Sequence, residues 1–181
     1  MVAAAKAAGA AATGGGAEIA AVDAGGQAGA VAEEKSVKGI AKGMKGIVET
    51  AKELGVELKV VAAGAANEDA GHLFAGAGNG ATAAQVANAT DAVSKVSGKQ
   101  IIKAIVDSKE GAGQKPAEAT SPIRAAIGTD DEGAPFGQEG MDKDDKIAAA
   151  IVLRGMAKDG KFAHENAAVG KAMKNRDGGG C

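Results

Sequence analysis

One short stretch carries the residue pattern of a phosphate-binding loop. Residues 155–161 (GMAKDGK) match the G-x-x-x-x-G-K core, in which backbone N–H groups and the lysine surround phosphates. Phe162 stands where such a loop carries the Ser or Thr that holds magnesium, and the preceding residues have the periodicity of a helix, not of a strand. Asp159 would also place a carboxylate beside the phosphates. The stretch is better interpreted as the end of a helix followed by a solvated lysine.

A second glycine cluster, in residues 76–80 (GAGNG), fails the dinucleotide-binding fingerprint. Its third glycine comes two residues after the second, where the fingerprint needs three, and no predicted strand precedes it. We interpret it as a flexible loop. The chain also lacks the G-x-S-x-G motif, and no carboxylate pair stands out by its spacing. We therefore expect no catalytic residue and no cofactor.

The residues that commonly bind metals are scattered along the chain. His72 and His164 are far apart in sequence, and Cys181 has no second cysteine. The acidic residues in 142–145 (DKDD) begin like a calcium loop, but Ile147 stands where that loop needs glycine. Carboxylates at a helix N-terminus explain the run better. We expect no metal site.

A basic stripe on a predicted helix is the one feature that could bind a ligand. Lys35, Lys38, Lys42 and Lys45 recur at steps of three or four residues, which places them on one helix face. A solvated surface is one interpretation of this face. The alternative is an adhesin site for a host polyanion such as a glycosaminoglycan.

The composition limits the elements that carry these residues. Apolar residues make up 45% of the 181 residues but aromatic residues only 2%, and 29 residues are glycine, so we expect one domain whose helices approach closely over small side chains. The net charge of −2 and the scarcity of aromatic residues argue against nucleic acid as a partner. No run reaches the roughly 18 apolar residues of a membrane span, and the N-terminus lacks the pattern of a signal peptide.

The strongest helix pattern runs from about Glu33 to Leu54, where apolar residues recur at helical spacing and Gly55 is a candidate C-cap. Gly39, Gly43 and Gly46 share another side of this helix.

Capping residues and turn residues mark the other predicted elements. Thr82 begins a helix, Ser97 and Gln100 form a capping-box pair before another, and residues 122–127 (PIRAAI) form a short helix that ends at Gly128. Residues 56–66 suggest a short helix and residues 67–80 a polar connection.

A last strong helix follows residue 141 and is expected to end at Gly160, and we predict no strand. The predicted fold class is all-α, an elongated bundle of short helices with long Gly/Ala-rich loops. We predict a weakly ordered Ala/Gly-rich segment over 1–32, in which residues 3–12 and 17–24 suggest short helices, and a helical domain over 33–163. A weakly helical or disordered tail follows over 164–181, in which residues 164–177 suggest a last weak helix.

Four segments together carry a family resemblance. Residues 141–163 (MDKDDKIAAAIVLRGMAKDGKFA) closely resemble the near-invariant block of the Vls and variable large protein family of Borrelia spirochaetes. Residues 36–48 (SVKGIAKGMKGIV), 96–106 (VSGKQIIKAIV) and 122–128 (PIRAAIG) resemble its framework and occur in the family's order. The resemblance covers roughly residues 33–163.

The resemblance implies a plasmid-encoded outer-surface lipoprotein whose central variable cassette is rewritten by recombination, so that host antibodies lose their target. Its invariant core or epitope block would comprise Met141, Asp144, Asp145, Ile147, Ile151, Leu153, Arg154, Met156, Lys158, Gly160 and Phe162. The segments that vary would be 55–81, part of 82–95, 107–120, 129–140 and 164 onward.

The resemblance also implies attachment to the membrane only through a lipid anchor. The printed sequence shows no lipid-attachment cysteine near its N-terminus and ends with KAMKNRDGGGC. We therefore expect a cassette-encoded fragment, a silent donor copy or a recombinant fragment, of unknown oligomeric state.

Overall fold

The computed structural model describes residues 2–12, 29–64, 67–78 and 80–165, which are helical and contain β-structure only as isolated bridges. The α-helices are α1 (Val2–Ala11), α2 (Glu34–Glu53), α3 (Ala83–Ser94), α4 (Gly98–Val106), α5 (Pro122–Ile127) and α6 (Asp144–Met156). Three 3-10 helices accompany them: η1 (Glu68–Phe74), η2 (Pro116–Glu118) and η3 (Glu139–Met141). The predicted all-α class is confirmed, and α2, with 20 residues, lies within one residue at each end of the helix predicted from about Glu33 to Leu54.

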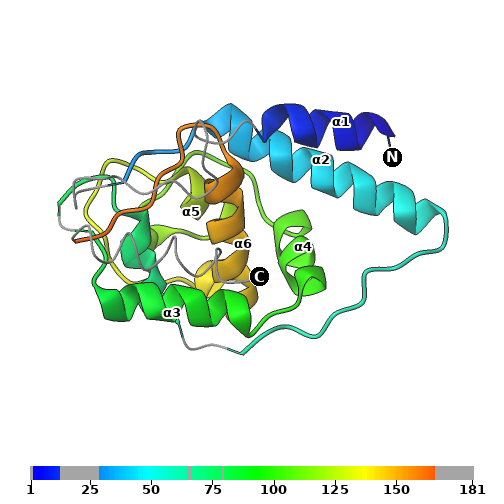
Figure 1. The fold of residues 1–181 in the computed structure, drawn as a ribbon. Helices are drawn as coiled ribbons and strands as arrows, with labels where there is room; N and C mark the ends of the chain where they lie inside the picture. Colours follow the sequence, from blue (N-terminus) through cyan, green and yellow to red (C-terminus); the bar gives the residue numbers. More distant parts are fainter. Residues whose placement is uncertain (1, 13–28, 65–66, 79, 166–181) are drawn as a thin grey trace, which may run out of the picture.

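Helix α6 lies at the centre, with α2, α3, α4 and α5 packed around it (Figure 1). Two apolar clusters meet on it. Ile147 and Ala150 belong to the cluster that includes Phe74 and the buried face of α3. Leu153 belongs to a second cluster, formed with residues of α2, α4 and α5. A helix that is apolar on nearly every side is stable only when it is enclosed in this way.

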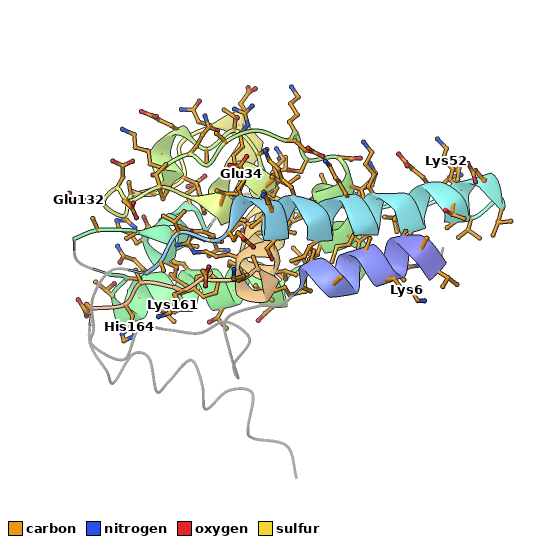
Figure 2. All side chains as sticks on the ribbon, turned by 90° about the horizontal axis from the view of Figure 1, so that it is seen from above. Lys6, Glu34, Lys52, Glu132, Lys161 and His164 are labelled. Atoms are coloured by element: carbon orange, nitrogen blue, oxygen red, sulfur yellow. The ribbon has the colours of Figure 1, made fainter. Side chains whose placement is uncertain are left out.

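Helix α1 lies antiparallel beside α2, and both project beyond the rest of the molecule (Figures 1 and 2). The predicted glycine side of α2 faces α1. A Cβ atom built on Gly39 would lie 2.6 Å from the Cβ of Ala11, and one on Gly46 would lie 3.1 Å from the Cβ of Ala4. Gly43 meets Ala8 more closely still. The small side chains therefore let the two backbones approach, as the composition predicts.

The predicted caps at Thr82, Ser97 and Gly128 are confirmed. The side chains of Thr82 and Ser97 each accept a hydrogen bond from the backbone N–H three residues later. The side chains of Gln85 and Gln100 in turn accept one from the backbone N–H of Thr82 and Ser97, which completes two capping boxes. Gly128 ends α5 with a φ of 73°, a conformation that favours glycine.

Residues 56–64 do not form the predicted helix; they have no regular secondary structure and run as a long irregular trace back from the tip of α2 (Figure 1). Gly55, with a φ of 83°, ends α2 far from the body of the molecule, and the chain must return. A helix of 20 residues is about 30 Å long, and nine extended residues span about the same distance. A helix of nine residues would be too short. We call residues 56–64 the strap.

Two other predictions are wrong. Residues 67–80 are not merely a polar connection, because η1 buries Leu73 and Phe74 in the core. The ring of Phe74 packs edge-on against Phe136 at 5.4 Å and against Phe162 at 5.7 Å between centroids. Helix α6 ends at Met156, not at Gly160, and the left-handed residue after it is Asp159, with a φ of 62°.

The first short helix suggested for the N-terminal segment, at 3–12, is present as α1 and packs against α2. The second helix suggested for that segment, at 17–24, and the predicted helix at 164–177 fall wholly or almost wholly outside the described residues.

Candidate functional site

The predicted invariant core or epitope block, which we call the framework block, lies mostly inside the molecule. Met141, Ile147, Leu153, Arg154 and Phe162 are almost fully buried, Asp144, Asp145 and Gly160 are buried, Ile151 and Met156 are partly buried, and Lys158 is exposed. This distribution follows from the central position of α6. The block supplies the internal packing, and the surface around it comes from other segments.

Asp144 connects the start of α6 to the end of the strap. Its backbone N–H donates to the carbonyl of Gly64 at 3.0 Å, and its Oδ1 accepts a hydrogen bond from Nδ2 of Asn67 at 3.0 Å. The carboxylate also lies at the helix N-terminus, where negative charge is favoured. Asp145 accepts from the backbone N–H of Lys146 at 2.9 Å.

Arg154 is the most unusual member of the block because its side chain is 0% exposed. Its Nε donates to the carbonyl of Lys161 at 3.0 Å, and one terminal nitrogen donates to the carbonyl of Ala30 at 2.7 Å. The other terminal nitrogen reaches the carbonyl of Ala126 at 3.3 Å, at the end of α5. The guanidinium carbon also lies 5.3 Å from the centroid of the Phe74 ring.

The partners of Arg154 come from four separated parts of the chain. Backbone carbonyls at the C-terminal end of a helix carry partial negative charge, so they stabilise a buried cation. Gly128 leaves room for the guanidinium, since a Cβ there would lie 2.6 Å from it. Burial lowers the pKa of Arg154 to about 10, so the group stays charged at neutral pH. Arg154 therefore fastens the N-terminal segment, α5, η1 and the C-terminal segment to α6.

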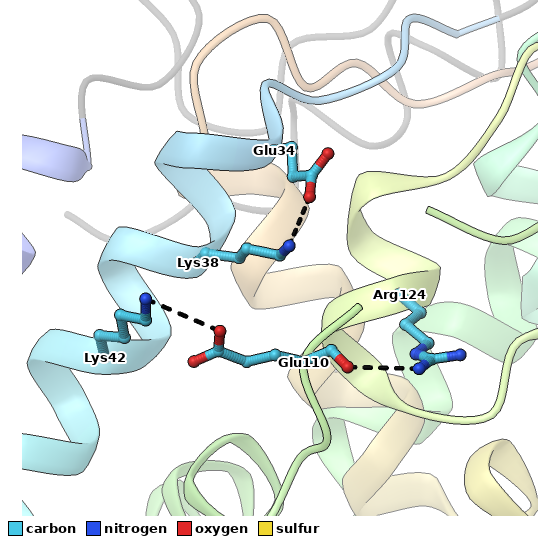
Figure 3. A network of polar contacts seen from close by, with 5 residues as sticks. All are labelled: Glu34, Lys38, Lys42, Glu110 and Arg124. Carbon is cyan, nitrogen blue, oxygen red and sulfur yellow. Dashed lines mark hydrogen bonds and ion pairs between the residues drawn. The ribbon is translucent and has the colours of Figure 1, made fainter. Parts of the chain in front are cut away.

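The basic stripe of α2 is partly neutralised (Figure 3). Lys38 pairs with Glu34, and Lys42 lies 3.7 Å from Glu110. Figure 3 also shows the carbonyl of Glu110 accepting a hydrogen bond from Arg124 at 3.3 Å. Lys35 and Lys45 are exposed, with no ion pair among the described residues. The structure therefore brings the four predicted lysines to one helix, together with two carboxylates from outside the stripe.

The sites for other chemistry stay dispersed in the part of the chain that is described. His72 is partly exposed and His164 is buried, and no three His, Cys, Asp or Glu side chains there gather as a metal site would require. No described helix has both the length and the apolar character needed to cross a membrane.

Comparison with known proteins gives the family. The model of the Borrelia lipoprotein family matches residues 1–176. The chain belongs to this family. Variable large protein 4 of Borrelia hermsii is 33% identical over 141 residues, which is 75% of this chain and 40% of that protein. Variable large protein 7 of the same organism is 33% identical over 162 residues, 84% of this chain and 42% of that protein.

A solved structure of the family extends the comparison to the fold. The crystal structure of the Lyme disease variable surface antigen VlsE of Borrelia burgdorferi matches with a TM-score of 0.77 and 51% identity, and the match covers 91% of this chain and 57% of that one. The predicted resemblance and the helical fold are confirmed. The chain spans about two fifths of the length of the curated family members that it matches. These matched proteins are variable large proteins and a variable surface antigen.

The sequence placed Arg154 in the predicted core or epitope block without revealing its role, and it did not single out Phe74. In the sequence, Arg154 looks like a charged residue that ends an apolar run. Its burial could not be predicted, because its carbonyl partners are distant in sequence. Phe74 stands in a glycine-rich stretch, so only its aromatic type could have marked it as a core residue.

Proposed function

We propose that this chain is the variable domain of an outer-surface lipoprotein and contributes to immune evasion by antigenic variation. The family membership and the likeness to variable surface antigens support this proposal. The observation that carries it is the segregation between a buried framework on α6 and exposed residues in the connecting loops. Recombination that replaces cassette sequence would change the loops and leave the framework intact.

The loops have a form that suits this function. Residues 129–140 expose Asp130, Asp131 and Glu132 but bury Phe136. Residues 107–120 likewise expose Lys109 and Glu110 and bury other positions. Each loop is thus fixed by a few apolar side chains, and the exposed positions between them are free to change with little loss of stability.

Antibodies raised against the folded chain test whether the exposed loop residues are the ones that antibodies recognise. We expect the triple variant Asp130→Ser, Asp131→Ser, Glu132→Ser to lose a measurable share of antibody binding and to keep the melting temperature of the parent. A matched triple variant on the exposed side of α3 and α4 (Asp91→Ser, Lys95→Ser, Lys99→Ser) measures the loss from any three surface changes. A large fall in melting temperature for the loop variant would contradict the proposal.

The framework should behave in the opposite way. Antibodies against a peptide of residues 144–156 should bind denatured protein and bind folded protein poorly, because Ile147, Leu153 and Arg154 are buried. On the same reasoning they should bind intact cells less well than shed or unfolded protein. Equal binding to folded and denatured chain would contradict this expectation.

An adhesin function for host polyanions is the second candidate, and the exposure of Lys35 and Lys45 favours it. Replacement of Lys35, Lys38, Lys42 and Lys45 by Gln should then abolish retention on a heparin column at low salt. A control with Lys95 and Lys99 replaced should be retained like the parent. Elution of the parent in the void volume would end this candidate.

A further inference from the structure

The strap differs from every other described connection in the fold. It has no regular secondary structure over nine residues, and its outward side chains are highly exposed, with Val61 at 85% and the Lys59 side chain also at 85%. Its two ends are held. The N–H of Val56 donates to the carbonyl of Ala51, and the carbonyl of Gly64 accepts from Asp144.

Between these two fixed ends, few hydrogen bonds hold the strap, although Leu58 and Val60 are partly buried. The N–H of Lys59 donates to the carbonyl of Glu57 at 3.1 Å, within the strap itself. The carbonyl of Val61 accepts from the exposed side chain of Gln100 at 2.9 Å. The carbonyl of Lys59 has no hydrogen-bond partner among the described residues. The ion pair of Lys59 with Glu57 is exposed and therefore weak.

We infer that the Lys59–Val60 bond is a site of specific hydrolysis by serine proteases that select lysine. Such enzymes bind the lysine side chain in a pocket and attack its carbonyl carbon with a serine oxygen. The substrate has to offer an extended backbone with free hydrogen-bonding groups, as in strand addition, and the strap can do so by opening only the Lys59–Glu57 and Gln100–Val61 hydrogen bonds. Water adds across the amide, leaving a carboxylate on Lys59 and an amino group on Val60.

The other basic residues of the described loops are protected by their backbone contacts. The carbonyls of Lys109, Lys115, Lys143, Lys158 and Lys161 accept hydrogen bonds from Ser121, Glu118, Ile147, Glu33 and Arg154, respectively. Lys95 lies in the three-residue connection between α3 and α4, which is too short to become extended. Cleavage at these positions needs local unfolding first, which lowers its rate.

The nicked protein keeps its fold because both fragments stay anchored. The fragment that ends at Lys59 retains α2, whose Val37 and Ile40 are buried in the core. Its Ala30 carbonyl still accepts from Arg154, and its Glu33 N–H still donates to Lys158. The fragment that begins at Val60 retains the Gly64–Asp144 contact. Hydrolysis would therefore open the strap and leave a two-chain surface protein.

Brief digestion of the folded full chain with a small amount of trypsin, followed by intact mass measurement, tests this inference. Among residues 29–165 the first cut should fall after Lys59, and the two products should elute together in size exclusion and separate only in denaturant. Lys59→Gln, and Val60→Pro, which keeps the lysine charge, should each slow the first cut in this range by about tenfold or more, because the remaining sites are cut only after the chain around them has unfolded locally.

Lys95→Gln is the matched control, with an exposed lysine next to a helix end, and it should be cut at the rate of the parent. A first cut elsewhere in this range, or an unchanged rate in both strap variants, would overturn the inference. Fragments that separate without denaturant would overturn its second part. None of these outcomes depends on the proposed antigenic function.

Discussion

At the scale of single residues, the buried cation of Arg154 is the contact that the fold can least replace. It is fully buried, and its hydrogen-bond acceptors are carbonyl groups of three separate segments. The planar guanidinium reaches several directions at once, which an ammonium group on a lysine cannot do. Removal of these bonds leaves buried carbonyl groups unsatisfied, at a cost of about 1–3 kcal/mol each.

Arg154→Lys should therefore lower the free energy of unfolding by on the order of 3 kcal/mol. For a protein of this size that corresponds to a fall in melting temperature of about 10 °C, measured by circular dichroism. Arg124→Lys is the matched control, because Arg124 is partly exposed and makes one carbonyl contact at 3.3 Å. An equal loss of stability in both variants would show that the buried hydrogen bonds of Arg154 contribute no more than the single exposed contact of Arg124.

Asp142 makes a smaller contribution that depends on pH. Burial acts to raise the pKa of Asp142, but the hydrogen bond and the charge of Lys146, 2.9 Å away, lower it more, so the net pKa is below 3.8. A carboxyl with a lowered pKa stabilises the folded state above its ordinary pKa, and this stability is lost as the pH falls through the lowered value.

Asp142→Asn should therefore cost a few tenths of a kcal/mol at neutral pH, because the pair is partly exposed and screened. Denaturant unfolding of both proteins at a series of pH values measures the difference. It should disappear as the pH falls below 3.8 and through the lowered pKa. A difference that persists in strong acid would mean that Asp142 acts through packing and not through its charge.

At the scale of elements, local signals predicted the helices and long-range geometry decided the connections. The bounds of α3, α4 and α5 follow from Thr82, Ser97 and Gly128, whose effects reach only a few residues. The strap was mistaken for a helix because its residues have no strong local preference, and the distance back from the tip of α2 is a property of the whole fold. The burial of η1 likewise depends on Phe136 and Phe162, which are far away in sequence.

The pairing of α1 with α2 gives a prediction in which two similar substitutions have opposite signs. Glycine in the middle of a helix costs about 0.5–1 kcal/mol relative to alanine. Gly9 of α1 has open space around it, so Gly9→Ala should stabilise the protein by that amount. Gly43 of α2 lies against Ala8, so Gly43→Ala should destabilise it despite the better helix propensity.

Thermal melts of the two variants decide the matter, and the amide exchange of α1 shows where the change acts. Gly43→Ala should increase exchange in α1 while the exchange of α6 stays close to that of the parent. If both substitutions stabilised the protein, the close approach of the two helices would be excluded.

At the scale of the whole molecule, exposed loops can share one buried helix, α6, only if the two apolar clusters around that helix unfold together as one unit. Both apolar clusters include residues of α6, with Ile147 in one and Leu153 in the other. A loss of packing in one cluster therefore weakens the surface on which the other is built. This coupling is what would allow many loops to change on a single unchanged framework.

Ile147→Ala and Leu153→Ala should each destabilise the protein by about 2–5 kcal/mol and leave one cooperative transition. Amide exchange should show that either substitution lowers protection in α2 and in α3 together, although α2 contacts only the Leu153 cluster and α3 only the Ile147 cluster. Ile102 of α4 is 37% exposed, so Ile102→Ala should not appreciably change the amide protection of α2 or α3. If Leu153→Ala loosened α2 while α3 kept its protection, the clusters would be independent units. The framework would then consist of two parts, and loops on one cluster could vary without constraint from the other.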